Sequence, residues 1–397
     1  MDKQDILKNH YNVDQFIEML GDRFPLLKEF KNTHQDKIWH AEGDVHIHTD
    51  MVLNETYDII ANEASYLSDD DKFCLIIGAL FHDIAKPVVT MEVERHGRTC
   101  VIAPKHEIRG MGYMIHKIQS LNISKDNIMK IMALIGYHQV PKMMIVRDKS
   151  KWDYYNLSQK APLDLLYFLE VADMKGRISD DLQNHLEYLE LFKLYAQDLD
   201  CFDKANMPFI SDNEYVQKKG FKALLNNVIH MPEEADGKFY NHKDNHGELV
   251  VMSGLSGVGK SSYIKTHYPE HTLVSLDELR GEIGKNRQDH SNEDKVLQQA
   301  RLRLKTLLAK KQKVVYDSTN IRSDFRDKVL TIGHNYDALT RLVFLTDSIE
   351  NIVKRDKERD HTVGENIIVN HQERRFDYPE HDEADDYSIV FNTVKKR

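Results

Sequence analysis

The sequence predicts a multidomain protein, with an all-α domain followed by an α/β domain built on a parallel sheet. The chain of 397 residues is too long for one hydrophobic core of ordinary size. Apolar residues recur at helical spacing in the first half, whereas strand-like and helix-like segments alternate after residue 248. We therefore expect the helical domain at 1–205, a linker region at 206–247 and the α/β domain at 248–397.

The composition indicates the cellular compartment of the protein and bears on whether it binds membranes or nucleic acid. Three cysteines without C-x-x-C spacing indicate a reducing compartment, and the longest apolar run, 73–81, is too short to span a membrane. We expect a cytoplasmic protein without a membrane partner. The formal charge of -10 arises entirely within residues 1–247, because residues 248–397 carry 25 Lys and Arg against 25 Asp and Glu. An acidic first half argues against wrapping long nucleic acid and leaves binding of a strand end open.

The α/β domain begins with a phosphate-binding pattern. An apolar segment, LVVMS, leads into the glycine-rich loop GLSGVGKSS at 254–262, which fits G-x-x-x-x-G-K-[ST]. In this pattern backbone amides wrap a triphosphate, the lysine reaches its outer phosphates and the serine hydroxyl binds Mg²⁺. We expect ATP or another NTP with Mg²⁺ as the cofactor of this domain. The expected binding residues are Gly254, Ser256, Gly257, Gly259, Lys260, Ser261 and Ser262.

Two aspartates are expected at the carboxyl edge of the predicted sheet. TLVSLD predicts a strand ending at Asp277, and KVVYDSTN predicts one ending at Asp317. Asp277 is suited to accept a proton from an attacking hydroxyl, and holding Mg²⁺ is its alternative role. Asp317 is the better candidate for the residue that holds Mg²⁺. A helix predicted at 293–310 and a strand at 338–347 complete the alternation.

A basic run follows near the C-terminus. KRDKER at 354–359 puts Arg355 and Arg359 on one helical face, a spacing suited to lid arginines that contact a transferring phosphoryl group. A solvated charge run is the alternative interpretation.

The first domain places histidines and aspartates at the ends of predicted elements. KFCLIIGALFHDIAK, residues 72–86, predicts a buried helix ended by Pro87, with His82 and Asp83 at its end. Burying these two groups is costly unless a partner such as a divalent metal ion pairs with them. His381 and Asp382 repeat the doublet in an acidic tail, so the buried context carries the prediction.

Further candidates lie at other element ends. His48 closes a histidine-rich segment ahead of a helix, His106 heads a helix and His138 follows one. Asp173 lies in an apolar helix, with Arg177 four residues on and on the same face. An intrahelical ion pair is the alternative interpretation of Asp173 and Arg177.

The order of these residues on a helical background resembles the HD phosphohydrolase superfamily. The resemblance implies two divalent transition-metal ions, for which imidazole-rich ligation favours Mn, Co, Ni or Cu. The first would be held by His48, His82, Asp83 and Asp173, and the second by Asp83, His106 and His138. Lys86 and Arg177 would contact phosphate oxygens as catalytic residues, and His40 is a further candidate, as a substrate contact or a proton donor.

The second domain resembles the polynucleotide 5′-kinase family over about residues 248–397. The resemblance rests on the phosphate loop, S-x-D-x-x-R at 275–280, D-S-T-N at 317–320 and the R-x-x-x-R pair. It implies Asp277 as general base, Arg280 on the phosphate next to the acceptor nucleotide, and Arg355 and Arg359 on the donor phosphates. Gly364 departs from the pattern, which has proline after the valine.

An HD module followed by such a kinase is similar to the bacterial HD-Pnk end-healing enzymes. The resemblance implies phosphorylation of 5′-OH ends and removal of a 2′,3′-cyclic phosphate or 3′-phosphate during RNA or DNA repair. The implied partners are RNA or DNA ends and a separate ligase acting downstream, and a homodimer is left open.

Two other functions compete with this interpretation. One is an HD-type nucleotide or alarmone hydrolase with a P-loop ATP-binding regulatory domain, which would have no need of Arg280 beside Asp277. The other is a small-metabolite kinase with a closed acceptor pocket.

Overall fold

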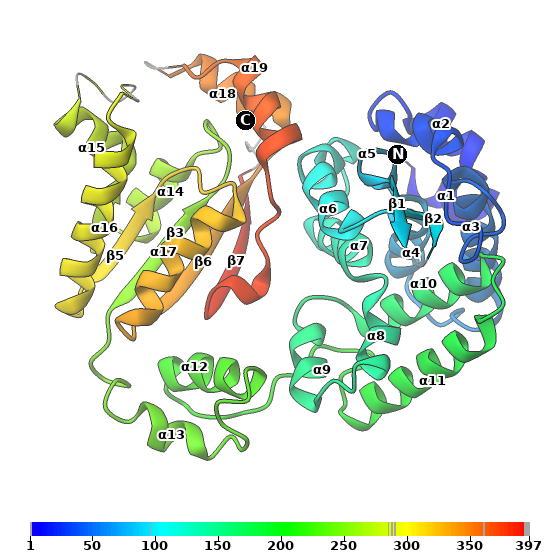
Figure 1. The fold of residues 1–397 in the computed structure, drawn as a ribbon, viewed down its shortest axis with the longest axis horizontal. Coiled ribbons are helices and arrows are strands. Elements are labelled where there is room, and N and C mark those ends of the chain that lie inside the picture. Colours follow the sequence, from blue (N-terminus) through cyan, green and yellow to red (C-terminus); the bar gives the residue numbers. More distant parts are fainter. Residues whose placement is uncertain are drawn as a thin grey trace. The chain divides into compact units, whose positions relative to one another are not determined.

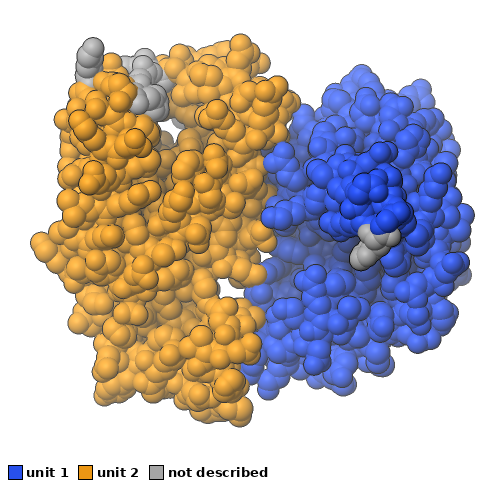
Figure 2. All heavy atoms as spheres, viewed as in Figure 1, with its two compact units in different colours: residues 1–208 blue, residues 209–397 orange. Residues whose placement is uncertain are grey.

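The computed structural model describes residues 2–95, 97–284, 286, 289, 291–359 and 362–392. The chain divides into two compact units, Met1–Pro208 and Phe209–Arg397 (Figures 1 and 2). Among the described residues, no helix combines the length and apolar character needed to cross a membrane.

The first unit is a helical assembly, as predicted. Helices α3, α4, α7 and α10 pack against one another around a core of aliphatic and aromatic side chains. Its helices are α1 (Lys3–Asn9), α2 (Val13–Leu20), α3 (Val45–Asn62), α4 (Asp69–Phe81), α5 (Lys86–Val89), α6 (His106–Lys117), α7 (Lys125–Tyr137), α8 (Val140–Val146), α9 (Lys151–Ser158), α10 (Leu163–Lys175) and α11 (Leu182–Asp198), with short helical turns η1 (Pro25–Asn32) and η2 (Ile118–Leu121).

One antiparallel hairpin adds strand structure to this unit, which the all-α prediction did not include. Strands β1 (Met91–Arg95) and β2 (Arg98–Ile102) pair in register, with Val93 opposite Cys100. Gly97 has φ +74°, the left-handed conformation that a tight turn favours. Both strands are short, and Cys100 is their one buried residue, so their period-two pattern is weak in the sequence.

The second unit contains a five-stranded parallel sheet covered by helices. The strands, in spatial order, are β4 (Thr272–Ser275), β5 (Lys313–Asp317), β3 (Glu248–Ser253), β6 (Leu339–Thr346) and β7 (Asp386–Phe391). β4 and β5 lie on one side of β3, and β6 and β7 lie on the other. The loop after β3 therefore lies where the strand order reverses, which is the usual ligand-binding position of such sheets.

Apolar residues of α16 and α17 pack on alternate residues of β3 and β5 to form one side of the core. The helices of this unit are α12 (Glu214–Leu225), α13 (Glu234–Phe239), α14 (Lys260–His267), α15 (Leu276–Ile283), α16 (Glu293–Ala309), α17 (Ser323–Asn335), α18 (Ile349–Lys357) and α19 (Glu365–Asn370), with short turns η3 (His371–Arg375) and η4 (His381–Glu383).

The stretch expected as a linker, 206–247, is folded instead. It contains α12 and α13, and nearly all of it belongs to the second unit. Tyr215 is buried and donates a hydrogen bond to Asp337 O at 3.0 Å, while Glu214 pairs with Arg341 at 2.7 Å. Both helices are short and contain a glycine, which lowers helix propensity and weakens the helical signal.

Three predicted boundaries shift. The strand expected to end at Asp277 ends at Ser275, and α15 starts at Leu276 because Leu276 and Leu279 are buried at helical spacing. The helix expected over 72–86 ends at Phe81. Arg359 lies two residues beyond the end of α18, so only Arg355 is helical.

Candidate functional site

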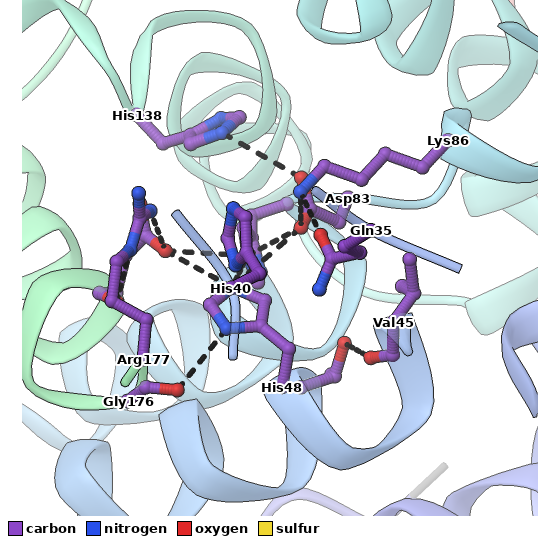
Figure 3. Close-up of polar contacts among 12 residues, drawn as sticks. Gln35, His40, Val45, His48, Asp83, Lys86, His138, Gly176 and Arg177 are labelled. Carbon is purple, nitrogen blue, oxygen red and sulfur yellow. Dashed lines mark hydrogen bonds and ion pairs between the residues drawn. The ribbon is translucent and has the colours of Figure 1, made fainter. Parts of the chain in front are cut away.

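The predicted metal ligands of the first unit converge from separate elements, and Figure 3 labels His48, Asp83 and His138 among them. His48 lies in the first turn of α3, His82 and Asp83 follow α4, His106 begins α6, His138 follows α7 and Asp173 lies in the last turn of α10. All six residues are at most 5% exposed. The structure therefore brings together the whole predicted set.

The four histidines are oriented by backbone carbonyls. Each Nδ1 lies at hydrogen-bond distance from a carbonyl oxygen: His82 to Ala79 at 2.7 Å, His106 to Ala103 at 2.9 Å, His138 to Ile135 at 3.0 Å and His48 to Gly176 at 3.1 Å. A carbonyl accepts only, so each Nδ1 donates its proton to the carbonyl, and Nε2 is the ring nitrogen left to bind a metal ion. This arrangement is typical of metal-binding histidines.

The Nε2 atoms meet in two pairs. His48 and His82 face each other at 3.3 Å, and His106 and His138 at 3.4 Å. The Asp83 carboxylate lies between the pairs, with Oδ2 at 3.2 Å from His82 and Oδ1 at 3.2 Å from His106. Ring nitrogens and carboxylate oxygens this close together need protons or a metal cation among them, because bare lone pairs would repel one another.

The charges fit cation binding. Burial opposes ionisation of Asp83, but the charges of His82 and Lys86 outweigh it and hold the pKa of Asp83 well below its ordinary value. Burial holds the pKa of His138 well below its ordinary value, which keeps the imidazole in the neutral form that binds metals.

Ligand atoms gather in three groups among the described residues. Each group has its atoms within 4.8 Å of one another: His48, His82 and Asp83; Asp83, His106 and His138; and His40, Glu42 and His48. The first two share Asp83, as a bridging ligand of two ions would be shared. Imidazole and carboxylate ligands suit transition metals, so the residues present fit the predicted pair of ions.

Lys86 and Arg177 both contact the cluster through ion pairs. Lys86 Nζ lies 2.7 Å from Asp83 Oδ2, and Arg177 pairs with Asp173 Oδ1 at 2.5 Å. The ion pair considered for Arg177 is therefore present. Both cations lie beside predicted metal ligands, and their expected contact with phosphate oxygens stays a prediction.

Glu42 is a site residue that the sequence prediction missed. Its carboxylate is fully buried and lies 2.8 Å from His40 Nδ1 and 3.1 Å from His48 Nδ1. Burial lowers the pKa of His40 to about 3, so this ring is neutral at physiological pH. The sequence places Glu42 two residues after His40, and this spacing was the available signal. It was not sufficient, because burial of Glu42 depends on the tertiary fold.

The phosphate loop of the second unit has the predicted strand–loop–helix context. β3 ends at Ser253, and α14 begins at Lys260. Gly259 has φ +106°, and a Cβ there would meet Asn392 Nδ2 at 2.3 Å, so this position accepts glycine only. Ser256 and Gly257 lie within the loop, and Ser261 and Ser262 lie in the first turn of α14.

Lys260 folds back on the loop in this structure. Its Nζ donates to Gly254 O at 2.9 Å and to Leu255 O at 3.1 Å. Removal of its ammonium group from water lowers the pKa of Lys260, and the charges of Asp317 and Asp277 oppose that shift. Asp317 and Asp277 are therefore near enough to Lys260 to interact with it electrostatically.

Asp277 and Arg280 lie on consecutive turns of α15. The Asp277 side chain is 63% exposed and pairs with Arg280 at 2.5 Å. Arg280 also pairs with Glu293 at 2.9 Å and is largely buried. Its guanidinium group therefore pairs with two carboxylates, which hold it in place. The sequence spacing did not predict the pair with Glu293.

The two arginines near the loop differ in their surroundings. Arg355 donates to Gly257 O at 3.0 Å and pairs at 2.7 Å with Asp347, whose side chain is 1% exposed. Arg359 is 42% exposed and donates to Ser256 Oγ at 2.9 Å. Both therefore contact the phosphate loop, but Arg355 is held by a buried carboxylate whereas Arg359 is accessible.

The departure at Gly364 has a structural explanation. Its φ is +94°, which proline cannot adopt, and its amide donates to Asp356 Oδ2 at 2.9 Å. Val363 N donates to the same carboxylate oxygen at 2.9 Å. Glycine thus allows a turn that fastens the segment after α18.

Comparison with family models agrees with these two sites. Residues 47–203 match the model described as HD domain, and residues 249–379 match the model described as AAA domain. A comparison with curated proteins gave no match. The chain therefore contains a region similar to HD domains, which holds the buried His/Asp cluster, followed by a region similar to AAA domains, which holds the phosphate loop.

Proposed function

We propose that the protein is a bifunctional end-healing enzyme for nucleic acids. Its second unit would transfer the γ-phosphate of an NTP to a 5′-OH polynucleotide end. Its first unit would remove a 2′,3′-cyclic phosphate or a 3′-phosphate. The proposed partners are RNA or DNA ends, and a separate ligase would then join the healed strands.

The observation that carries the kinase proposal is the accessible carboxylate of Asp277. It is 63% exposed and interacts electrostatically with Lys260, whose loop would hold the donor phosphates. A regulatory NTP-binding domain has no need of a carboxylate open to an acceptor. Asp277 would take the proton of the 5′-hydroxyl group. At the same time the hydroxyl oxygen would bond to the γ-phosphorus, and the bond from the γ-phosphorus to the departing nucleoside diphosphate would break. Lys260 and the loop amides would bind the phosphates, and Arg359 would stabilise the transferring group.

The hydrolytic proposal rests on the buried cluster around Asp83. Two divalent ions held by the predicted ligands would supply Lewis-acid activation of the phosphate and a water of lowered pKa. Lys86 and Arg177 would bind the phosphate oxygens. Neutral His40, held by Glu42 through Nδ1, would present Nε2 as a hydrogen-bond partner to the substrate.

Labelled ATP tests the kinase proposal directly. With Mg²⁺ present, labelled phosphate should appear at the 5′ end of a 5′-OH oligonucleotide and not on free nucleosides. Transfer to nucleosides alone would favour a small-metabolite kinase. Absence of transfer, together with hydrolysis of free nucleotides by the first unit, would favour an HD-type nucleotide hydrolase with a regulatory P-loop domain.

A further inference from the structure

A cavity opens beside the His/Asp cluster of the first unit. It has a volume of about 160 Å³. Lys86, His40 and His106 line one part of it, and each belongs to the cluster or contacts it. A phosphate bound at the cluster would therefore have the rest of its molecule directed into or across this cavity.

Trp39 lines the same cavity and is 47% exposed. Exposing a large aromatic ring to water is unfavourable, and such rings are enriched where a ligand covers them. Trp152, the other tryptophan of the chain, is 7% exposed and lies in α9. The exposed ring is thus the one beside the candidate active centre.

The loop that carries Trp39 is held from two sides. Buried Asp36 accepts hydrogen bonds from Val101 N at 3.1 Å and from Arg98 at 2.9 Å, which join the loop to β2. Ala41 N donates to Ile178 O at 3.1 Å, on the segment after α10. The ring is therefore presented by a fixed backbone, which lowers the entropic cost of binding a ligand against it.

The remaining walls suit a flat, partly polar ring. Val101, Ile102 and Ala103 supply an apolar surface, while the side chains of His34 and Gln139 supply hydrogen-bonding groups. An aromatic surface, an apolar wall and a few polar groups at the edge together form the usual environment of a stacked nucleobase.

We infer that Trp39 stacks on the nucleobase of the nucleotide whose phosphate is hydrolysed at the His/Asp cluster. This inference rests on the proposed hydrolytic function. It names the substrate class of that site as a nucleoside phosphate, with the base in the cavity and the phosphate near Lys86. Free nucleotides and the terminal nucleotide of a strand share this chemistry, and the experiment below separates them.

Steady-state hydrolysis tests the inference with a matched pair of substrates. Adenosine 2′,3′-cyclic phosphate carries a base, and glycerol 1,2-cyclic phosphate presents a similar ring without one. Trp39→Ala should raise KM for the adenosine substrate by about 5- to 150-fold, the range that stacking of one base provides. Its kcat should stay near the wild-type value, and Trp39→Phe should restore most of the affinity. Hydrolysis of the glycerol substrate should not change.

The neighbouring Ile38 provides the control. It is 54% exposed on the same loop, so Ile38→Ala removes apolar surface without removing the aromatic ring. An equal effect of Trp39→Ala on both substrates, or no effect on either, would overturn the inference. Repeating the comparison with an oligonucleotide that ends in a 2′,3′-cyclic phosphate separates the two sources. A matching KM increase assigns the cavity to strand ends, and an increase confined to the mononucleotide assigns it to free nucleotides.

Fluorescence keeps this test independent of the proposed activity. Trp152→Phe leaves Trp39 as the single tryptophan. Adenosine 3′-monophosphate should quench its emission in a saturable manner, and ribose 5-phosphate should not. Quenching in a protein that hydrolyses no cyclic phosphate would contradict the proposed activity and leave the base pocket supported. Absence of quenching would overturn the base pocket whatever the activity.

Discussion

The His/Asp cluster of the first unit and the phosphate loop of the second differ in how their polar groups find partners. In the first unit, buried imidazole nitrogens face one another at 3.3 and 3.4 Å around a shared carboxylate. In the second, Lys260 donates to its own loop, and Arg355 pairs with Asp347. The first arrangement gathers ligand atoms that an added metal cation can bridge, whereas the cationic side chains of the second are paired within the protein before a ligand arrives. Metal supply should accordingly control one region and leave the structure of the other intact.

Loss of the bridging carboxylate should have the largest effect. Asp83→Ala removes the ligand shared by both ion sites, so hydrolysis should fall by on the order of 10³-fold or more. Kinase activity with Mg²⁺ alone should remain, because the P-loop uses a serine hydroxyl and phosphate oxygens. Parallel assays of both reactions, with and without added Mn²⁺, measure this separation.

Two variants complete that comparison. Lys260→Ala should abolish phosphate transfer and retain hydrolysis. Asp382→Ala alters the exposed histidine–aspartate doublet near the C-terminus and should affect neither reaction. Loss of both activities in folded Asp83→Ala or folded Lys260→Ala would show that the two regions are coupled.

The next effect concerns the general base. Asp277→Asn keeps the shape of the side chain but cannot accept the hydroxyl proton, so turnover should fall by about 10² to 10⁴-fold with ATP affinity retained. Single-turnover transfer and ATP titration measure the two quantities. The neighbouring Glu278→Gln is the matched control. Loss of ATP binding in Asp277→Asn would instead assign the residue to Mg²⁺.

The two arginines should separate into different roles. Arg359→Ala removes an accessible cation and should lower kinase turnover by on the order of 10²-fold without altering stability. Arg355→Ala leaves buried Asp347 without its cation, so the free energy of unfolding should fall by about 3 kcal/mol. Turnover assays and denaturant unfolding distinguish the variants. Equal stability of the two variants would contradict this assignment.

A smaller effect should appear in the pH dependence of stability. Burial raises the pKa of Glu170 to about 7 against the opposing charge of Lys142. The folded state therefore binds the proton more tightly than the unfolded state does, and this contribution is complete below the ordinary pKa of 4.5 and is lost as pH rises through about 7.

Glu170→Gln should remove this contribution to the pH dependence. The slope of unfolding free energy between pH 5 and 7 should be less negative in the variant than in the wild type. Tryptophan emission reports on the first unit, because Trp39 and Trp152 both lie within it. Identical slopes in the two proteins would show that Glu170 does not titrate in this range.

The sequence predicted the residues of both regions where local patterns determine their positions. His82 and Asp83 followed a nearly all-apolar helix, and the glycine-rich loop followed an apolar strand, so burial and geometry could be inferred from neighbours in the chain. The alternation of strands and helices likewise predicted the parallel sheet that is observed.

Features that depend on distant residues were not predictable in this way. Asn392 donates to Val258 O of the phosphate loop, and Asp347 pairs with Arg355, which donates to Gly257 O. Nothing near Asn392 or Asp347 in the sequence marks these roles. The same holds for Glu42, whose burial requires the packing of α3 beside the segment after α10. The folded segment at 209–247 was missed because its helices are short.

One substrate tests the central proposal most directly. It is an RNA oligonucleotide with a 5′-OH at one end and a 2′,3′-cyclic phosphate at the other, incubated with the protein, ATP, Mg²⁺ and Mn²⁺. Mass spectrometry should find a 5′-phosphate and a free 3′ end on the same strand. Recovery of the strand with both ends unchanged, while free nucleotides are hydrolysed, would contradict it.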